Sequence, residues 1–239
     1  MKHTGHISEF TIYRLSVYKR CLEQLEREQL TTISSKDFAN RFGLNSAQVR
    51  KDLACFGEFG IRGMGYPIST LREQIATILG FAKNSNGPQK WTAVLIGAGR
   101  LGSALLTSQQ FFAHGFEIHA AFDLLPDSSD YRRQADAKLL DKEIPLYPVE
   151  KLEDVLKKMP TDIAILAVSE ADAQDLADRV TALGIRAILN FVPVQLLVPP
   201  DVKVRTVDLA AELQCLTYHL HNSHSESEDG ERPMPAADA

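Results

Sequence analysis

The chain has 239 residues, of which 44% are hydrophobic and 24% are charged, and its formal net charge is −5. This length allows one large or two small domains with a real core, which excludes a short peptide module. The composition is that of a globular protein and excludes wholesale disorder and a collagen-like or coiled-coil design. The sequence starts without an apolar run of signal-peptide length, and no later stretch approaches the roughly 20 apolar residues of a membrane helix. We therefore expect a cytoplasmic protein.

The cysteines favour neither disulfides nor a metal site. Cys21, Cys55 and Cys215 are odd in number, lie far apart and form no CxxC pair. This spacing fits neither a disulfide framework nor a thiolate metal cluster. We interpret all three as packing thiols and expect no metal.

Charge divides the chain. Residues 1–83 contain 12 lysines and arginines against 8 acidic residues, whereas residues 84–239 contain 14 against 23. A basic N-terminal third on an acidic body is typical of a nucleic-acid-binding module joined to a non-binding domain. A domain with a slightly cationic solvated face is the alternative. The polar run KNSNGPQK marks the boundary, and we expect a linker over residues 83–91.

Residues 8–82 begin with a helix that Ser8 can cap. Its apolar residues recur at three- and four-residue spacing, as on one buried stripe: Ile12, Leu15, Tyr18, Leu22 and Leu25. Ser34 or Ser35 then caps a short helix that Gly43 ends. A third helix, capped by Ser46, follows at once, so the pattern predicts helix, tight turn, helix.

The third helix has an apolar and a polar face. Val49, Leu53 and Phe56 face inward, which directs the other residues of its N-terminal half outward: Ser46, Gln48, Arg50 and Lys51. In helix-turn-helix proteins this half enters the major groove of DNA. Because three-helix domains also serve as dimerisation modules, the DNA prediction depends on these exposed basic residues.

The segment GEFGIRGMGYPI is too rich in glycine for a helix and suits a tight hairpin, the wing of a winged helix. Arg62 at its tip can reach phosphates or a narrow minor groove. A solvated turn arginine is the alternative. Ser69 then opens a helix that returns to the core of this domain.

Residues 92–207 predict a Rossmann-type parallel sheet. WTAVLIGAGRLGSALL joins an apolar strand to a helix through a GxGxxG loop that cradles a diphosphate: Gly97, Ala98, Gly99, Arg100, Leu101 and Gly102. Asp123 ends the next strand, 21 residues after Gly102, where a carboxylate accepts hydrogen bonds from a ribose. NAD is then favoured over NADP, because a 2′-phosphate would meet a like charge. A strand-end Asp that caps a turn is the alternative.

Strands and helices continue to alternate, which predicts an open, mostly parallel sheet. Ligands lie beyond the carboxyl ends of such strands, where four residues are placed to line the nicotinamide: Val168, Asn190, Phe191 and Pro193. An apolar pocket favours NADH, because the pyridinium of NAD+ costs free energy to desolvate. The sequence contains no His and Asp proton relay, no YxxxK pair and no HExxH, so we expect a binding protein and not an enzyme.

Several of these motifs, in the same order, resemble the Rex family of redox-sensing transcriptional repressors. They are QVRKDLACFGEFGIRGMGYPI, LIGAGRLGSAL, AAFD, ILNFVPVQLLVP and VDLAAELQCLTYHL. The resemblance spans about residues 7–222 and implies a homodimer that binds an inverted-repeat operator through winged helices. It also implies that the Rossmann domain senses the NADH/NAD+ ratio and that DNA is released when NADH binds.

The resemblance assigns further roles. The helix at 208–222 is similar to a domain-swapped element that places Leu209 beside the partner's nicotinamide. Arg20 and Asp208 match a pair that couples cofactor state to domain orientation. Ser108 stands where several relatives have a tyrosine. Any coupling that depends on that tyrosine hydroxyl is therefore not carried over to this chain.

Two rival functions stay open at this point: an NAD-dependent oxidoreductase with a helical accessory domain, and a protein that binds another adenine nucleotide such as CoA. Only a repressor explains the basic helix face and the glycine wing. Residues 223–239 have no apolar periodicity and five acids against one arginine, which predicts a disordered acidic tail.

Overall fold

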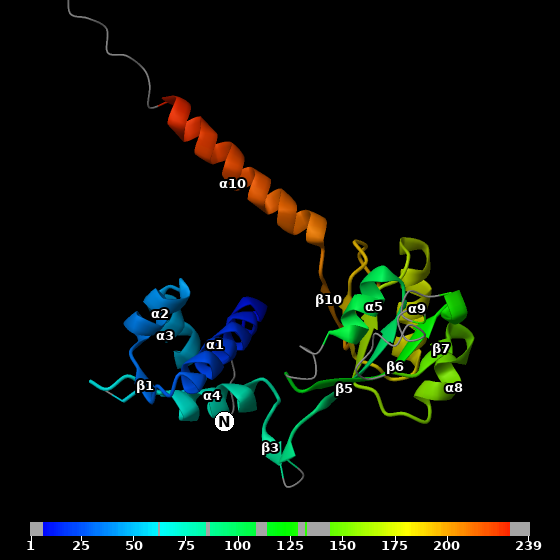
Figure 1. Cartoon of the computed structure of the whole chain (residues 1–239), viewed down its shortest axis with the longest axis horizontal. Coiled ribbons are helices and arrows are strands. Elements are labelled where there is room, and N and C mark those ends of the chain that lie inside the picture. Colours follow the sequence, from blue (N-terminus) through cyan, green and yellow to red (C-terminus); the bar gives the residue numbers. More distant parts are fainter. Residues whose placement is uncertain are drawn as a thin grey trace, which may run out of the picture. The chain divides into compact units, whose positions relative to one another are not determined.

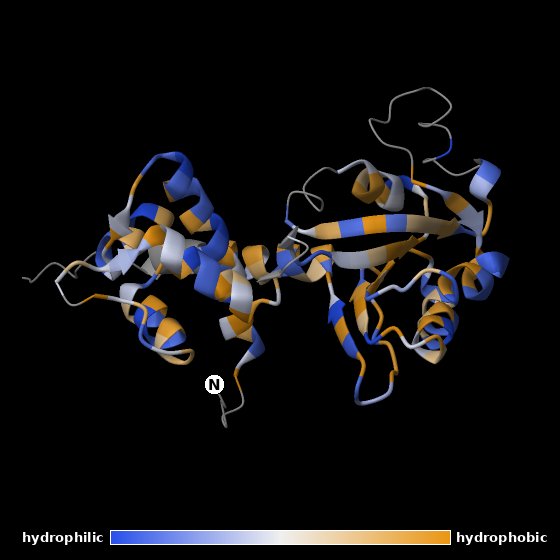
Figure 2. Ribbon diagram, turned by 90° about the horizontal axis from the view of Figure 1, so that it is seen from below, coloured by the Kyte–Doolittle hydropathy of each residue, from blue (hydrophilic) through white to orange (hydrophobic). Residues whose placement is uncertain are grey.

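The computed structural model describes residues 7–61, 63–84, 87–108, 114–128, 132 and 144–229. It divides into two compact units, and the chain passes from the first to the second between Lys90 and Trp91 (Figure 1). In Figure 2 the helices of both units carry alternating hydrophobic and hydrophilic bands, the pattern of elements that bury one face.

The first unit is a helical domain with a small sheet. Its elements, in chain order, are α1 (Glu9–Arg27), β1 (Thr32–Ile33), α2 (Ser35–Phe42), α3 (Ser46–Ala54), β2 (Tyr66–Pro67) and α4 (Ile68–Ile78). Strands β1 and β2 pair antiparallel, with Ile33 opposite Tyr66. The predicted winged-helix architecture is confirmed.

Helix α1 begins as the sequence predicts, because the Ser8 hydroxyl accepts the N–H of Phe10 at 3.2 Å. The buried stripe differs at one position. Thr11 is buried, whereas Ile12 is 38% exposed, so the prediction that Ile12 joins the core is wrong. The reason is a polar contact: the Thr11 hydroxyl donates to the buried carboxylate of Asp52, which turns this end of the stripe by one residue.

Helix α3 is capped one residue earlier than predicted. The side-chain oxygen of Asn45 accepts the N–H groups of Ala47 and Gln48 at 2.9 and 3.0 Å, so Ser46 is not the cap. Asn is as good a cap as Ser, and only the backbone conformation decides between neighbours. For α2, Ser34 is the cap and Ser35 begins the helix.

The second unit is an α/β domain. Its elements are β5 (Trp91–Ile96), α5 (Arg100–Thr107), β6 (Phe116–Asp123), β7 (Leu146–Pro148), α8 (Leu152–Leu156), β8 (Ile163–Leu166), α9 (Glu170–Ala182), β9 (Ala187–Asn190), β10 (Lys203–Thr206) and α10 (Leu209–Asp229), with short 3-10 turns at Pro126–Ser128 and Val149–Lys151. The strands form one parallel sheet in the order β10-β9-β8-β5-β6-β7.

This strand order is that of a Rossmann fold, which confirms the predicted fold class. Both faces of β5 are buried because alternate residues enter different cores. Val94 and Ile96 pack with residues of α8 and α9, whereas Ala93 and Leu95 pack on the α5 side. The order reverses between β5 and β8, so a crevice for ligands is expected at their carboxyl ends.

Three expectations of the sequence are corrected. The polar run expected as a linker over 83–91 contains a hairpin, β3 (Lys83–Asn84) with β4 (Gly87–Pro88), and β5 already begins at Trp91. Helix α10 runs to Asp229, seven residues into the expected disordered tail, because no helix breaker precedes Gly230. The rest of that tail, 230–239, lies outside the described residues.

The cysteines are the third correction. All three are free, and only Cys21 is partly buried. Cys55 and Cys215 are exposed, so they are not packing thiols. Cys55 follows the last turn of α3 on its solvent side, and Cys215 belongs to a helix whose residues 209–221 are all exposed.

Candidate functional site

The first candidate site is the exposed side of α3. The chain turns sharply between α2 and α3 at Gly43, which adopts the left-handed conformation. Val49 and Leu53 are buried, as predicted, and fix which side of α3 faces solvent. Arg50 and Lys51 are exposed there. Within the part of the chain that the structure describes, no carboxylate forms an ion pair with either, so this face keeps a positive charge.

Three of the predicted residues on this helix differ in their surroundings. Arg50 donates from Nη1 to the Ser35 hydroxyl at 3.0 Å, which places its guanidinium across the turn from α2. Ser46 is half-buried. Gln48 is also half-buried, and its amide points inward to Asp52, so the expectation of an outward Gln48 is wrong.

The wing follows α3. Ile61 and Gly65 form an antiparallel bridge, and the turn between them passes through Gly63 and Met64. Gly65 has φ +89° and lies against β1, where a Cβ would come within 2.4 Å of the Ile33 carbonyl oxygen. Only glycine fits this place. Arg62, the predicted tip residue, lies outside the described residues.

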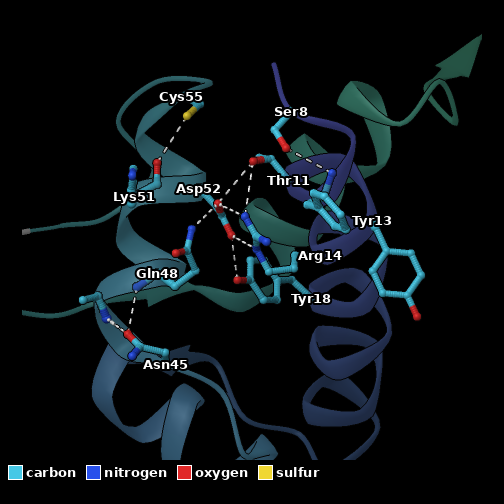
Figure 3. A network of polar contacts seen from close by, with 12 residues as sticks. Ser8, Thr11, Tyr13, Arg14, Tyr18, Asn45, Gln48, Lys51, Asp52 and Cys55 are labelled. Carbon is cyan, nitrogen blue, oxygen red and sulfur yellow. Dashed lines mark hydrogen bonds and ion pairs between the residues drawn. The ribbon is translucent and has the colours of Figure 1, made fainter. Parts of the chain in front are cut away.

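A buried polar cluster joins α3 to α1 (Figure 3). Its centre is Asp52, whose side chain is 2% exposed. Arg14 donates to both carboxylate oxygens, at 2.5 and 2.7 Å, and the Tyr18 hydroxyl donates at 2.9 Å. Burial acts to raise the pKa of Asp52, but hydrogen bonds from Arg14, Gln48 and Tyr18 outweigh it and lower this pKa.

Sequence reasoning missed this cluster. The signal was present, because Asp52 lies between the buried apolar residues Val49 and Leu53 of α3. A carboxylate on such a face needs a buried partner. Arg14, three residues from Thr11 on α1, is that partner, but only the packing of α1 on α3 identifies it.

The second candidate site is the glycine loop after β5. Gly97 has φ +98°, and a Cβ there would come within 2.2 Å of the Ala167 carbonyl oxygen that follows β8. A Cβ on Gly102 would lie 1.7 Å from the Gly97 carbonyl oxygen. A Cβ on Gly99, by contrast, meets nothing within 4 Å. Two glycines are therefore required by the fold, and the third leaves open space at the N-terminus of α5, which begins at Arg100.

This open N-terminus fits a diphosphate. Gly99 is the cap of α5, and no side chain hydrogen-bonds there, so the first N–H groups of the helix are available. Arg100 and Leu101 are exposed beside it, and Ala98 is buried. The backbone donors and the positive helix end together suit an anionic group.

Asp123 lies at the end of β6 next to the loop. One carboxylate oxygen accepts the N–H of Ala98 at 2.6 Å, and the other accepts the N–H of Leu125 at 2.9 Å. The second bond is the turn-capping contact that the sequence left as the alternative. The first bond joins β6 to the glycine loop, so the two predicted features are adjacent.

The residues expected near the nicotinamide divide into two groups. Val168 and Phe191 are half-buried, and Pro193 is exposed. Asn190 is fully buried, and its amide bonds to the backbone of Val192, on both N–H and carbonyl, at 3.0 and 2.9 Å. Its side chain therefore shapes the loop after β9, and its amide is already occupied by backbone groups.

The residues at the start of α10 are exposed. Asp208 caps the helix by accepting the N–H groups of Ala210 and Ala211 at 2.9 and 3.0 Å. Leu209 is 62% exposed. Arg20 is also exposed but belongs to the first unit, and Ser108 ends α5.

The described residues contain no group of His, Cys, Asp and Glu that could hold a metal ion. No described helix is both long and apolar enough to cross a membrane.

Two family models match the chain. Residues 6–54 match "Putative DNA-binding protein N-terminus", and residues 88–194 match "CoA binding domain". The first covers α1 to α3 of the helical unit, and the second covers the parallel sheet from β5 to β9.

Full-length relatives are more specific. The chain is 44% identical to the redox-sensing transcriptional repressor Rex of Desulfitobacterium hafniense, over 91% of this chain and 97% of that protein. It is 36% identical to Rex of Streptomyces avermitilis, over 97% of this chain and 86% of that protein. The relatives are regulators by name, which does not support the oxidoreductase alternative.

Solved structures agree. A crystal structure of RSP, a Rex-family repressor, in complex with β-NAD+ and operator DNA matches with a TM-score of 0.77 and 31% identity, covering 96% of this chain and all of that one. RSP in complex with β-NADH matches with the same score over 94% of this chain. The chain belongs to the Rex family of redox-sensing transcriptional repressors.

Proposed function

We propose that this protein is a homodimeric repressor that binds an inverted-repeat operator and is released from it when NADH binds the second unit. The observation that carries this proposal is that one chain combines two features. One is a helix-turn-helix whose exposed face presents Arg50 and Lys51, and the other is a parallel sheet whose glycine loop leaves free space at Gly99. A regulator that senses NADH needs both parts.

On the DNA side, Arg50 and Lys51 are proposed to contact the operator from the major groove, with Ser46 at the entry of α3. Support comes from their exposure and from the absence of any ion pair with a described carboxylate. Arg62 is proposed for the minor groove beside the wing, on the basis of its place in the sequence.

On the ligand side, the loop from Gly97 to Gly102 is proposed to hold the diphosphate and Asp123 the adenosine ribose. One Asp123 oxygen accepts the Ala98 N–H, so a ribose would add to or replace this bond. Val168, Phe191 and Pro193 are proposed to line the nicotinamide. An apolar lining favours NADH, because its dihydropyridine ring is uncharged.

Helix α10 is proposed to be the dimer contact and the swapped element. Its leucines recur with a seven-residue period and are 59–63% exposed: Leu209, Leu213, Leu216 and Leu220. Such a seam is unfavourable in water, and a second copy covers it symmetrically. Leu209 would then lie beside the partner's nicotinamide, and Asp208 would pair with Arg20.

The mechanism is a shift between an open dimer that matches both operator half-sites and a closed dimer that does not. NADH must prefer the closed form by about 5 kcal/mol to convert a mostly open population into a mostly closed one. Two binding sites share this requirement. Reciprocity demands that operator DNA weaken NADH binding by the same factor.

We propose the cytoplasm as the location and a regulatory role without turnover of NADH. The units are proposed as a winged-helix domain over 8–82, an NAD(H)-binding domain that begins with β5 at Trp91 and ends at 207, and a swapped helix from 208, with the hairpin of β3 and β4 between the first two in the chain. This division follows the change in sequence pattern described above.

The test is a DNA-binding titration at fixed salt, because phosphate contacts make affinity fall steeply with ionic strength. The DNA is an inverted repeat that the protein itself selects from a random pool. NADH should release the protein, and NAD+ should do so much less. Equal effects of the two nucleotides, or steady consumption of NADH with a carbonyl compound, would refute the proposal.

A further inference from the structure

The buried cluster around Asp52 connects α3, whose exposed side is the first candidate site, to α1 (Figure 3). Asp52 follows Lys51 directly and lies four residues after Gln48, in the second half of α3. Its partners Arg14 and Tyr18 are four residues apart on α1, so they lie on one face of that helix. The carboxylate therefore joins the second half of α3 to one face of α1.

The geometry of this contact is restrictive. The Arg14 guanidinium binds both carboxylate oxygens, and such a fork fixes the relative orientation of its two partners. Apolar contacts such as those of Val49 and Leu53 are not directional and tolerate small rotations of a helix. The cluster thus defines how far α3 is rotated about its own axis.

Gln48, on α3 itself, adds a further hydrogen bond to the cluster. Its amide donates to Asp52 Oδ1 at 2.8 Å, and this bond directs the side chain toward α1. Gln48 is therefore not free to contact a base while the bond is intact. Arg50 and Lys51 are left as the exposed long polar side chains of this half of α3.

We propose that Asp52 is a positioning residue for operator recognition, which sets the rotation of α3 through Arg14 and Tyr18 and holds Gln48 as part of this support. The inference rests on the proposed function of α3 as the recognition helix. Gln48 then acts through Asp52 and not on a base pair.

A role in stability alone does not account for so polar a contact. Replacement of a buried ion pair by apolar residues of similar volume is often neutral or stabilising. What a fully satisfied polar network adds is a unique arrangement of the groups that it joins. Because hydrogen bonds lower the pKa of Asp52, the carboxylate stays charged at neutral pH, and protonation does not weaken the contact there.

The experiment compares full-length variants for binding to the selected operator and to a scrambled duplex. Asp52→Asn keeps the shape but removes the charge. On electrostatics alone it should bind any DNA more tightly, since a negative charge is lost. The positioning role predicts the opposite for the operator: its affinity falls about tenfold relative to the scrambled duplex, the scale of one misplaced base contact.

Single base-pair substitutions in the operator give the second readout. Asp52→Asn and Gln48→Ala should reduce discrimination at several base pairs together, because the whole helix is displaced. A residue that contacts one base loses discrimination at that base pair only. The slope of affinity against salt should stay unchanged in both variants, since the number of phosphate contacts is the same.

Glu26→Gln is the matched control. Glu26 on α1 pairs with Arg72 of α4 at 2.7 Å, a partly buried ion pair that does not involve α3. It should leave the ratio of operator to scrambled affinity within about twofold, inside ordinary variation. A loss equal to that of Asp52→Asn would show that general destabilisation explains both and would overturn the inference.

If Asp52→Asn does not fold, Tyr18→Phe decides. Tyr18 is buried, so it cannot touch DNA, and phenylalanine keeps its ring contacts while removing one hydrogen bond to Asp52. Its affinity ratio should fall about threefold, and an unchanged ratio would overturn the inference. Arg50→Ala distinguishes a failure of this inference from a failure of the proposed function of α3. If Arg50→Ala leaves operator binding unchanged, the recognition helix itself is wrongly assigned, and the inference fails with it.

Discussion

Gly99→Ala should separate ligand binding from folding in the second unit. Gly99 has φ −67° and ψ −161°, which alanine adopts without strain, and a Cβ there meets no atom within 4 Å. The substitution stabilises the folded state by about 0.4–1 kcal/mol, because alanine restricts the unfolded chain more than glycine does. It destabilises the folded state by about the same amount, because alanine is a poorer helix cap than glycine. The free energy of unfolding should therefore stay within about 1 kcal/mol of the parent value.

Ligand binding should respond differently. The added methyl group occupies the open space at the N-terminus of α5, where the diphosphate is proposed to lie. Displacing the diphosphate by one atom breaks at least one hydrogen bond to a charged group, which is worth about 1.5–3 kcal/mol. The affinity for NADH should fall roughly 10- to 100-fold.

The assay is titration calorimetry with NADH alongside urea unfolding of the same samples. Ala104→Ser, at an exposed position of the same helix, is the control and should change neither quantity. Gly102→Ala provides the contrast, because its Cβ would lie 1.7 Å from the Gly97 carbonyl oxygen and should destabilise the unit itself. Unchanged NADH affinity in Gly99→Ala would refute the placement of the diphosphate.

Asp123→Asn should lower the affinity for NADH about tenfold, which is the scale of one charged hydrogen bond, and should reduce the ratio of NADH affinity to NADPH affinity. If titration shows equal losses of affinity for both nucleotides, Asp123 does not contact the ribose. Asn190→Leu leaves the Val192 N–H unpaired inside the protein and should destabilise the second unit by about 1–3 kcal/mol, measured by urea unfolding; a direct ligand role would instead appear as lost NADH affinity at unchanged stability. The lowered pKa of Asp52 means that its contribution to stability is complete above the unfolded pKa of about 4 and is lost as the pH falls through the folded value. Urea unfolding between pH 5 and pH 3 should therefore show a weaker pH dependence in Asp52→Asn, and an identical dependence would argue against the ion pair.

Local patterns in the sequence were enough for the elements and for the glycine loop. Gly97 and Gly102 were predicted as glycines of the dinucleotide loop, and the clashes that a Cβ would make at each show why the loop needs glycine there. Ser8 was predicted as a cap and is one. These features depend on a few neighbouring residues, whose preferences are set by backbone geometry.

Other positions could not be predicted, because partners distant in the chain decide them. Periodicity placed Gln48 on the outer face of α3, but the buried charge of Asp52 draws its amide inward. Strand-end position made Asn190 a ligand contact, but the loop after β9 uses its amide to satisfy backbone groups.

The two-part architecture, the helix-turn-helix and the dinucleotide loop follow from local patterns in the chain, since periodicity, caps and glycines act over a few residues. Which polar side chains face solvent and which are buried depends instead on how the helices and strands pack. Arg14 and Asp52 are 38 residues apart, and nothing local in either helix predicts their pairing. A buried charge must find its partner wherever packing places one, and that choice depends on the whole fold.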